Sequence, residues 1–216
     1  MQGAADSVLP DEDQARAHCY ALISRLFYAP ADADLLGLLS GPPAAATQQA
    51  QALQSENADA APDMDPYTSA FAALQEVCRT ADADTVRREY DDLFVGAGRA
   101  LISPYTSGYT APHAPDRHLV ALRGRLSGFA LARRDAVFEL EDHVSAVCDV
   151  MRWLIERGRS IEEQRAFFDE FVRGGVSGFC TAIETRAPTS FHRAVAAVAL
   201  AFIAIEQHAF ELHSGE

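Results

Sequence analysis

Apolar residues recur at three- and four-residue intervals along most of this 216-residue chain, which is the spacing of one helix face. The first such stretch runs from Ala15 to Phe27. Asp11 or Asp13 is placed to cap a helix here, and Pro30 is placed to end it. The chain therefore opens with an amphipathic helix.

The same spacing predicts most of the remaining elements. Gly158 and the pair Gly174-Gly175 are expected helix ends, and Pro188 suits the first turn of the last helix. Neither a strand of convincing length nor a repeat of 20–50 residues is visible. The sequence thus predicts an all-α fold, a single-domain helical bundle over 1–216. The further helices are expected at about 34–39, from 66 to the high seventies, and at 84–94, 116–133, 141–157, 160–173, 177–186 and 189–212.

Two segments interrupt the helical pattern. Residues 43–65 are rich in Ala, Gln, Asp and Pro, and we expect a loop or a weakly held, mobile helix. Residues 95–115 contain three Gly and three Pro, together with aromatic and large aliphatic residues. A loop of this length in a compact domain is usually functional or disordered, and its bulky residues favour a function.

Composition narrows the classes of partner. The formal charge is −13, and all 18 basic residues are Arg. This balance argues against nucleic-acid binding and against adhesion to anionic lipid, both of which need a basic face. It favours encounter with a basic partner, or serves solubility alone.

The compartment follows from what the chain lacks. Residues 1–14 have neither the basic nor the apolar region of a secretory signal, and no run of about 18 apolar residues predicts a membrane span. We therefore expect a cytoplasmic protein. The cysteines have no CxxC spacing, so a zinc site or a thioredoxin-like motif is not expected. They are Cys19, Cys78, Cys148 and Cys180.

The first candidate site spans residues 89–109. A helix carrying Leu93 and Phe94 is followed by Gly96, which tolerates unusual backbone angles, and Pro104 then holds the chain extended. Such a loop suits a groove that grips a peptide, with Tyr105 supplying amphipathic surface. The alternative is a long connection whose aromatic residues plug the bundle. The candidate residues of this segment are Glu89, Asp91, Asp92, Leu93, Phe94, Gly96, Pro104, Tyr105, Ser107 and Tyr109.

The second candidate site is residues 139–144, where carboxylates stand at a helix start and favour its dipole. Asp142 is placed to cap the helix or to orient the ring of His143. The functional interpretation is a polar cluster of Glu141, Asp142 and His143 that binds a cationic peptide, and the alternative is ordinary capping.

Enzyme motifs are missing from the sequence. There is no GxSxG elbow, Walker loop or HExxH, so no cofactor or metal is expected. Glu89 and Asp92 are three residues apart and, with Asp142 and His143, are candidates for acid–base chemistry. Glu89 and Asp92 are explained more simply as a solvated acidic edge.

The two candidate segments together resemble a known family. The pattern E-x-x-x-L-F-x-G-x-G at 89–98, then P-Y-x-S at 104–107 and E-D-H at 141–143, is similar to the TorD/DmsD/NarJ redox-enzyme maturation chaperones. The resemblance covers about 15–212. The chain departs from the family in having Ala97, Ser103 and the pair Leu140-Glu141 where the family often has proline, and in having its only Trp at 153.

The resemblance implies a non-enzymatic, cytoplasmic role. Such chaperones bind a molybdenum-cofactor oxidoreductase of the DMSO-reductase type, or its twin-arginine signal peptide, and delay export until the cofactor is inserted. In this chain the acidic residues are candidates for the arginines, and the apolar and aromatic residues for the apolar part of the peptide. A fixed assembly subunit of a respiratory oxidoreductase is a further alternative. Both a monomer and a domain-swapped dimer are compatible with the resemblance.

Overall fold

The computed structural model describes residues 9–41, 65–96, 100–133, 139–187 and 191–213. Within these ranges the chain is helical and forms no β-strand, and pairing of extended backbone is confined to an isolated bridge between Tyr105 and His143. The all-α prediction is confirmed. The expectation of a loop or mobile helix at 43–65 falls almost entirely outside the described residues.

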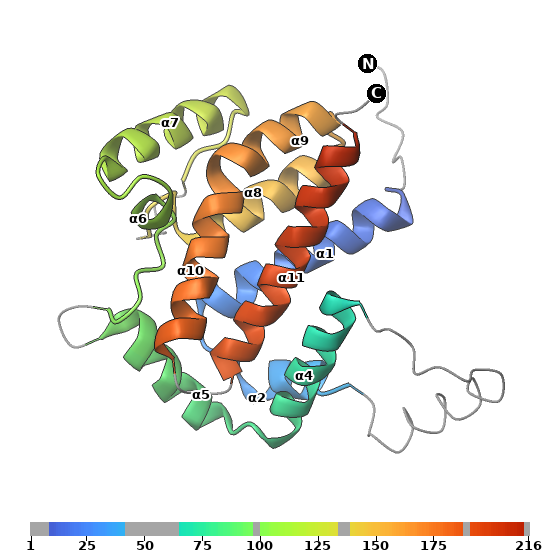
Figure 1. The fold of residues 1–216 in the computed structure, drawn as a ribbon, viewed down its shortest axis with the longest axis vertical. Helices are drawn as coiled ribbons and strands as arrows, with labels where there is room; N and C mark the ends of the chain where they lie inside the picture. Colours follow the sequence, from blue (N-terminus) through green and yellow to red (C-terminus); the bar gives the residue numbers. More distant parts are fainter. Residues whose placement is uncertain (1–8, 42–64, 97–99, 134–138, 188–190, 214–216) are drawn as a thin grey trace.

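Two of the described helices continue directly into π-helical turns. Figure 1 shows how the helices are arranged. In order they are α1 (Asp11–Tyr28), α2 (Ala33–Leu39), α4 (Pro66–Thr80), α5 (Ala83–Tyr90) with η2 (Asp91–Val95), α6 (Ser107–Thr110), α7 (Pro115–Gly128), α8 (Val144–Glu156), α9 (Ile161–Phe167) with η3 (Phe168–Val172), α10 (Arg173–Arg186) and α11 (Phe191–Leu212).

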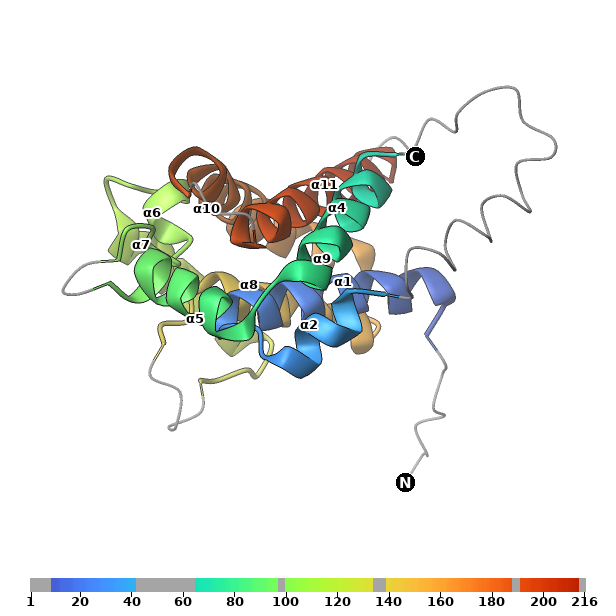
Figure 2. The same cartoon turned by 90° about the horizontal axis from the view of Figure 1, so that it is seen from below.

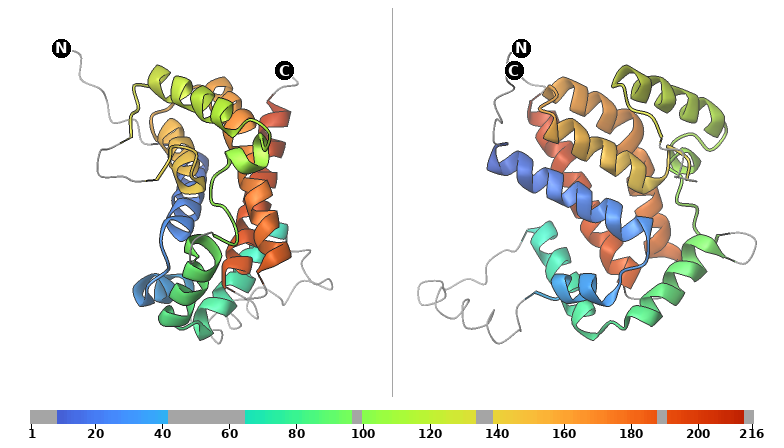
Figure 3. Two further views of the ribbon diagram at one scale, coloured as in Figure 1. Left: turned by 90° about the vertical axis from the view of Figure 1, so that its left-hand side faces the viewer. Right: turned by 180° about the vertical axis from the view of Figure 1, so that it is seen from behind.

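The helices form two layers around an aromatic core. α1 lies along α8, whereas α11 lies between α10 and α4 (Figures 2 and 3). Between the layers, the rings of Phe27 and Phe179 meet edge to face with centroids 4.9 Å apart, and the rings of Tyr20 and Phe202 do so with centroids 4.8 Å apart. Burial of such rings is the main stabilising contribution of this core.

Most helix starts follow the capping rules. The side chains of Asp32, Asp65 and Asp82 accept backbone hydrogen bonds at the starts of α2, α4 and α5. The expected cap of α1 was wrong, because Pro10 is its N-cap and makes no side-chain cap bond. The three acidic residues that follow Pro10 lie inside the first turn, where they favour the helix dipole.

The expected helix end at Gly174-Gly175 was also wrong, because the chain stays helical from α9 through η3 into α10. A Cβ on Gly175 would lie 2.4 Å from the Cβ of Thr106, and one on Gly178 would lie 2.7 Å from the Cβ of Tyr109. These glycines therefore allow α6 to approach α10 closely. Gly158, with φ of 57°, does follow the end of α8 as expected.

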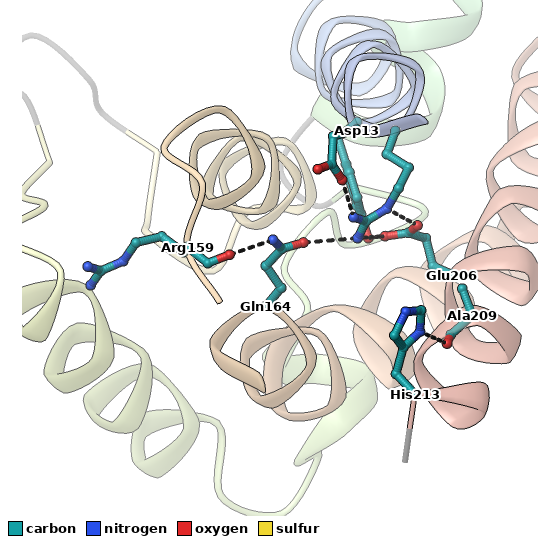
Figure 4. A network of polar contacts seen from close by, with 8 residues as sticks. Asp13, Arg159, Gln164, Glu206, Ala209 and His213 are labelled. Atoms are coloured by element: carbon teal, nitrogen blue, oxygen red, sulfur yellow. Dashed lines mark hydrogen bonds and ion pairs between the residues drawn. The ribbon is translucent and has the colours of Figure 1, made fainter. Parts of the chain in front are cut away.

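A buried polar network joins α1, α9 and α11 (Figure 4). Arg16 donates to both carboxylate oxygens of Glu206, at 2.7 and 3.0 Å, and to Oε1 of Gln164 at 3.0 Å. Tyr20 donates to the same Glu206, whose side chain is 1% exposed. A charge buried this deeply is tolerated because it is paired.

One described helix, α11, is long and apolar enough to cross a membrane by length and composition alone. The sequence analysis expected no such segment. Core helices of soluble proteins share this composition, and α11 buries Val195, Phe202 and Phe210 against the rest of the bundle.

Candidate functional site

The two candidate segments meet in space through their backbones. The N–H of Val144 donates to the carbonyl of Pro104 at 2.8 Å, and the N–H of Thr106 donates to the carbonyl of Asp142 at 2.8 Å. The hydroxyl of Thr106 reaches the same carbonyl at 3.1 Å. Residues 104–106 are thereby fixed against the start of α8.

Tyr105 and His143 form the centre of this junction. Their rings meet edge to face with centroids 5.7 Å apart, and the Tyr105 hydroxyl donates to Oε2 of Glu139 at 2.6 Å. Partial burial, followed by this bond to the carboxylate, raises the pKa of Tyr105 to about 12. Tyr105 therefore stays protonated and donates to Glu139 throughout the neutral range.

His143 itself caps α8, because its Nδ1 accepts a hydrogen bond from the N–H of Ser145 at 3.2 Å. Burial lowers the pKa of His143, and the nearby carboxylates of Glu139 and Asp142 oppose this only in part. The imidazole is therefore neutral at pH 7, with its proton on Nε2.

The Asp142 carboxylate bonds to Ser107 and not to the His143 ring that it was expected to orient. Its side chain is buried, and Oδ2 accepts from the N–H of Ser107 at 3.4 Å. Asp142 therefore holds the start of α6. Its Oδ1, and Nε2 of the buried His118, have no hydrogen-bond partner among the described residues. Burial lowers the pKa of His118, against the effect of Asp142 and Glu170.

A groove of about 700 Å³ runs along α1 and α8, and we call it the α1–α8 groove. Its lining is apolar at Ala21, Ala146, Val150 and Trp153, with charged groups at intervals. The other lining residues are Ser24, Arg25, Tyr28, Leu126, Leu131, Ala132, Arg133, Glu139, Leu140, Glu141, His143, Ser145, Asp149 and Arg152.

A second, smaller cavity of about 330 Å³ adjoins the groove, and we call it the aromatic pocket. It shares Glu139 and His143 with the groove, so the two cavities meet at the junction described above. The aromatic pocket is lined by Tyr90, Phe94, Val95, Ala100, Ser103, Pro104, Tyr105, Glu139 and His143.

Several sequence-predicted residues thus line these cavities. Phe94, Pro104, Tyr105 and His143 surround the aromatic pocket, and Glu141 lines the groove. Three other predicted residues do not line the cavities. Leu93 is buried and its carbonyl accepts a backbone hydrogen bond from Ile102, and Ser107 is buried at the start of α6. Gly96 follows the end of η2 with φ of 61°.

The remaining predicted residues lie elsewhere. The carboxylate of Glu89 accepts from both the backbone N–H and Nδ1 of His192, at 2.9 and 2.8 Å, and fixes α5 to the start of α11. Tyr109 packs against Phe179 of α10. Asp91 and Asp92 are exposed on η2 and line neither cavity.

The acidic groups of the junction differ in their partners. Glu141 accepts from Arg123 at 2.9 Å and lies 3.9 Å from Arg133, and the bond from Arg123 lowers its pKa. In contrast, among the described residues no Arg lies within ion-pair distance of the Glu139 carboxylate.

The sequence analysis did not select several residues that line the cavities. Tyr90 lies inside the first candidate segment and Trp153 was noted as the only Trp, but neither was selected. Arg25 belongs to a regular helical stretch and gave no signal beyond periodicity. Glu139 lies in the segment singled out, but only the E-D-H part of that segment was selected. The feature that distinguishes Glu139 is the hydrogen bond from the Tyr105 hydroxyl, and this contact joins residues that are far apart in the sequence.

Comparison with known proteins is consistent with this geometry. The family model described as nitrate reductase delta subunit matches residues 60–180. The chain belongs to this family. The family is that of the NarJ/TorD-like chaperones, which supports a role in molybdoenzyme maturation. A search of curated proteins gave no match. The family match contains both junction segments, although α1 and α11 lie outside it.

Membership of a chaperone family implies a non-enzymatic role. The alternative of acid–base catalysis required a closed pocket holding Glu89, Asp92, Asp142 and His143. Glu89 bonds to His192 and Asp142 to Ser107, whereas Asp92 is exposed. His143 is the member of this set that lines the described cavities.

Proposed function

We propose that this chain is a cytoplasmic chaperone that holds the N-terminal, twin-arginine signal segment of its molybdoenzyme client in the α1–α8 groove before export. The observation that carries the proposal is the backbone junction of 104–106 with 142–144. This junction lies within the segment that matches the family, and it sets an apolar groove and an aromatic pocket side by side.

The groove has the chemistry of such a segment, in which basic residues precede an apolar stretch. Ala146, Val150 and Trp153 offer an apolar floor on one side of α8, which suits the apolar face of a helical or extended peptide. Tyr28 and Leu140 on its rim are 54% and 40% exposed. Exposed apolar side chains beside a groove are typical of protein interaction sites.

Charge favours the same ligand. The chain has 31 acidic and 18 basic residues, so a basic segment is attracted over long range. This attraction predicts that association slows as ionic strength rises, whereas dissociation from the apolar floor changes less.

The chain provides its own reporter for the test, because its only Trp, Trp153, lines the groove. Peptides of client N-terminal segments are titrated into the protein while Trp153 emission is recorded. We expect a saturable change, with binding weakened at least tenfold by Ala146→Arg, which places a charge on the floor. Leu212→Arg on α11, outside the groove, is the matched control.

Calorimetry on Trp153→Phe distinguishes loss of binding from loss of signal. That variant should bind the peptide within a few-fold of the natural chain. If none of several client segments binds, the proposed recognition of the signal segment is wrong. If Ala146→Arg binds as well as Leu212→Arg, the proposed location is wrong.

A further inference from the structure

We propose that the aromatic pocket is a receptor for one arginine side chain, whose guanidinium pairs with Glu139 and lies against the surrounding rings. This inference rests on the proposed function for its biological ligand, since the pocket opens beside the groove. The pocket chemistry itself is argued from charge, aromatic walls and size.

The charge of the pocket comes from the Glu139 carboxylate. The Glu139 carboxylate has one hydrogen bond among the described residues, from Tyr105 to Oε2, and no Arg within ion-pair distance. The neighbouring carboxylate, Glu141, is already paired with Arg123. His143 is neutral because burial lowers its pKa, so it does not supply the missing positive charge. Among the described residues, therefore, no cation pairs with the Glu139 carboxylate, and Arg133 reaches only the backbone carbonyl of Glu139, at 3.4 Å.

The walls of the pocket are aromatic. The rings of Tyr90 and Phe94 meet edge to face with centroids 5.1 Å apart, and Tyr105 also lines the pocket. The hydroxyl of Tyr90 donates to the carbonyl of Tyr28 at 2.8 Å, so this ring is held in place before any ligand arrives. Ring faces attract cations, and the attraction grows where the cation is partly desolvated.

The size of the pocket and the shape of the ligand also favour arginine. A volume of about 330 Å³ is at the lower end of ligand pockets, which suits a single side chain rather than a peptide segment. Guanidinium is planar, stacks on aromatic rings and offers several N–H donors to a carboxylate, whereas ammonium is a compact, strongly hydrated charge. Glu139 disfavours phosphate and other anions. Arginine therefore fits this pocket better than lysine.

The test uses the full chain and a probe that does not depend on any client. N-acetyl-arginine methylamide is titrated while NMR follows the ring resonances of Tyr105 and His143. The citrulline analogue, which has the same shape without the charge, and the lysine analogue are compared. We expect saturable shifts in the millimolar range with arginine, and at least tenfold weaker binding of citrulline.

Variants locate the site. Glu139→Gln should weaken arginine binding at least tenfold, whereas Glu156→Gln removes the same charge from the end of α8, outside both cavities, and should change it less than twofold. Tyr105→Phe keeps the charge of Glu139 and removes its competing donor. This variant should bind arginine at least as tightly as the natural chain, and it tests the proposal even if Glu139→Gln does not fold.

The results that would overturn the inference are specific. They are the absence of saturable shifts, equal binding of citrulline, or tenfold weaker binding by Tyr105→Phe with its fold intact. Failure here is distinct from failure of the proposed function. If client peptides change Trp153 emission while the arginine probe does not bind, the function stands and the arginine pocket fails. If the probe binds and no client peptide does, the pocket stands and the function fails.

Discussion

Tyr105 donates a 2.6 Å hydrogen bond to Glu139, and this bond spans 34 positions of the chain. It lies where the groove and the aromatic pocket meet, beside the backbone bonds that fix 104–106 to the start of α8. The geometry of both cavities therefore depends on contact between the two segments.

Replacing Glu139 with Gln should lower the pKa of Tyr105 from about 12 toward its ordinary value of 10 without reaching it. Burial raises this pKa and remains in the variant, whereas the acceptor charge is lost. The pKa is measured from the Tyr105 ring carbon in NMR spectra between pH 8 and 12.5. An unchanged pKa would contradict the bond to Glu139.

The raised pKa of Tyr105 also predicts how the unfolding free energy changes at alkaline pH. The folded pKa lies above the unfolded one, so the contribution of Tyr105 is fully present below pH 10 and is lost as pH rises through about 12. Tyr105→Phe should therefore reduce the fall in unfolding free energy over this range. Urea denaturation at pH 9 and 11 measures the difference, with Tyr28→Phe as the control. An equal fall in Tyr105→Phe and the control would argue against the linkage.

Gly175→Ala should destabilise the chain by about 1–3 kcal/mol and displace α6. The new Cβ would lie 2.4 Å from the Cβ of Thr106, which is itself bonded to Asp142. Gly124→Ala in α7 meets nothing within 4 Å and should be stabilising by about 0.5–1 kcal/mol. Chemical denaturation compares the two, and equal effects would show that α6 does not need the glycine.

Arg16→Met should cost about 3 kcal/mol of unfolding free energy. The replacement leaves the Glu206 carboxylate buried without the arginine that donates to both of its oxygens. Arg152→Met removes a partly exposed arginine that pairs with Asp149 and Glu156, and should cost less than about 1 kcal/mol. The double replacement of Arg16 and Glu206 by Met should recover part of the loss. A cost for Arg16→Met no larger than that for Arg152→Met would show that this network contributes little.

Acidification should destabilise the junction. Burial lowers the folded pKa values of His143 and His118, so the unfolded chain binds more protons and the unfolding free energy falls as pH drops below the ordinary histidine value. Glu139, Asp142 and Glu170 oppose this shift. His118→Leu should flatten the fall between pH 7.5 and 5.5, as measured by urea denaturation, whereas the exposed His213→Leu should not. A steeper fall in His118→Leu would reverse the sign argued here.

Periodicity predicted most helices because an apolar face is a local property of the sequence. The expectation that glycine ends a helix failed at Gly174-Gly175, because the missing side chain of Gly175 allows Thr106 to approach from another part of the chain. The same limit applies to the site. Residues 104–107 and 139–143 were each singled out locally, but their contact, and the different partners of Glu89, Glu139 and Glu141, depend on the tertiary fold.

The proposal that the client lies in the α1–α8 groove is tested most directly by photo-crosslinking with the intact client precursor. A photoreactive phenylalanine replaces Tyr28 on the groove rim, or Leu212 at the exposed end of α11. We predict that the Tyr28 position crosslinks to the N-terminal segment of the client and that the Leu212 position does not. Crosslinking from Leu212 but not from Tyr28 would contradict the proposal, as would crosslinks from Tyr28 that exclude the client N-terminal segment.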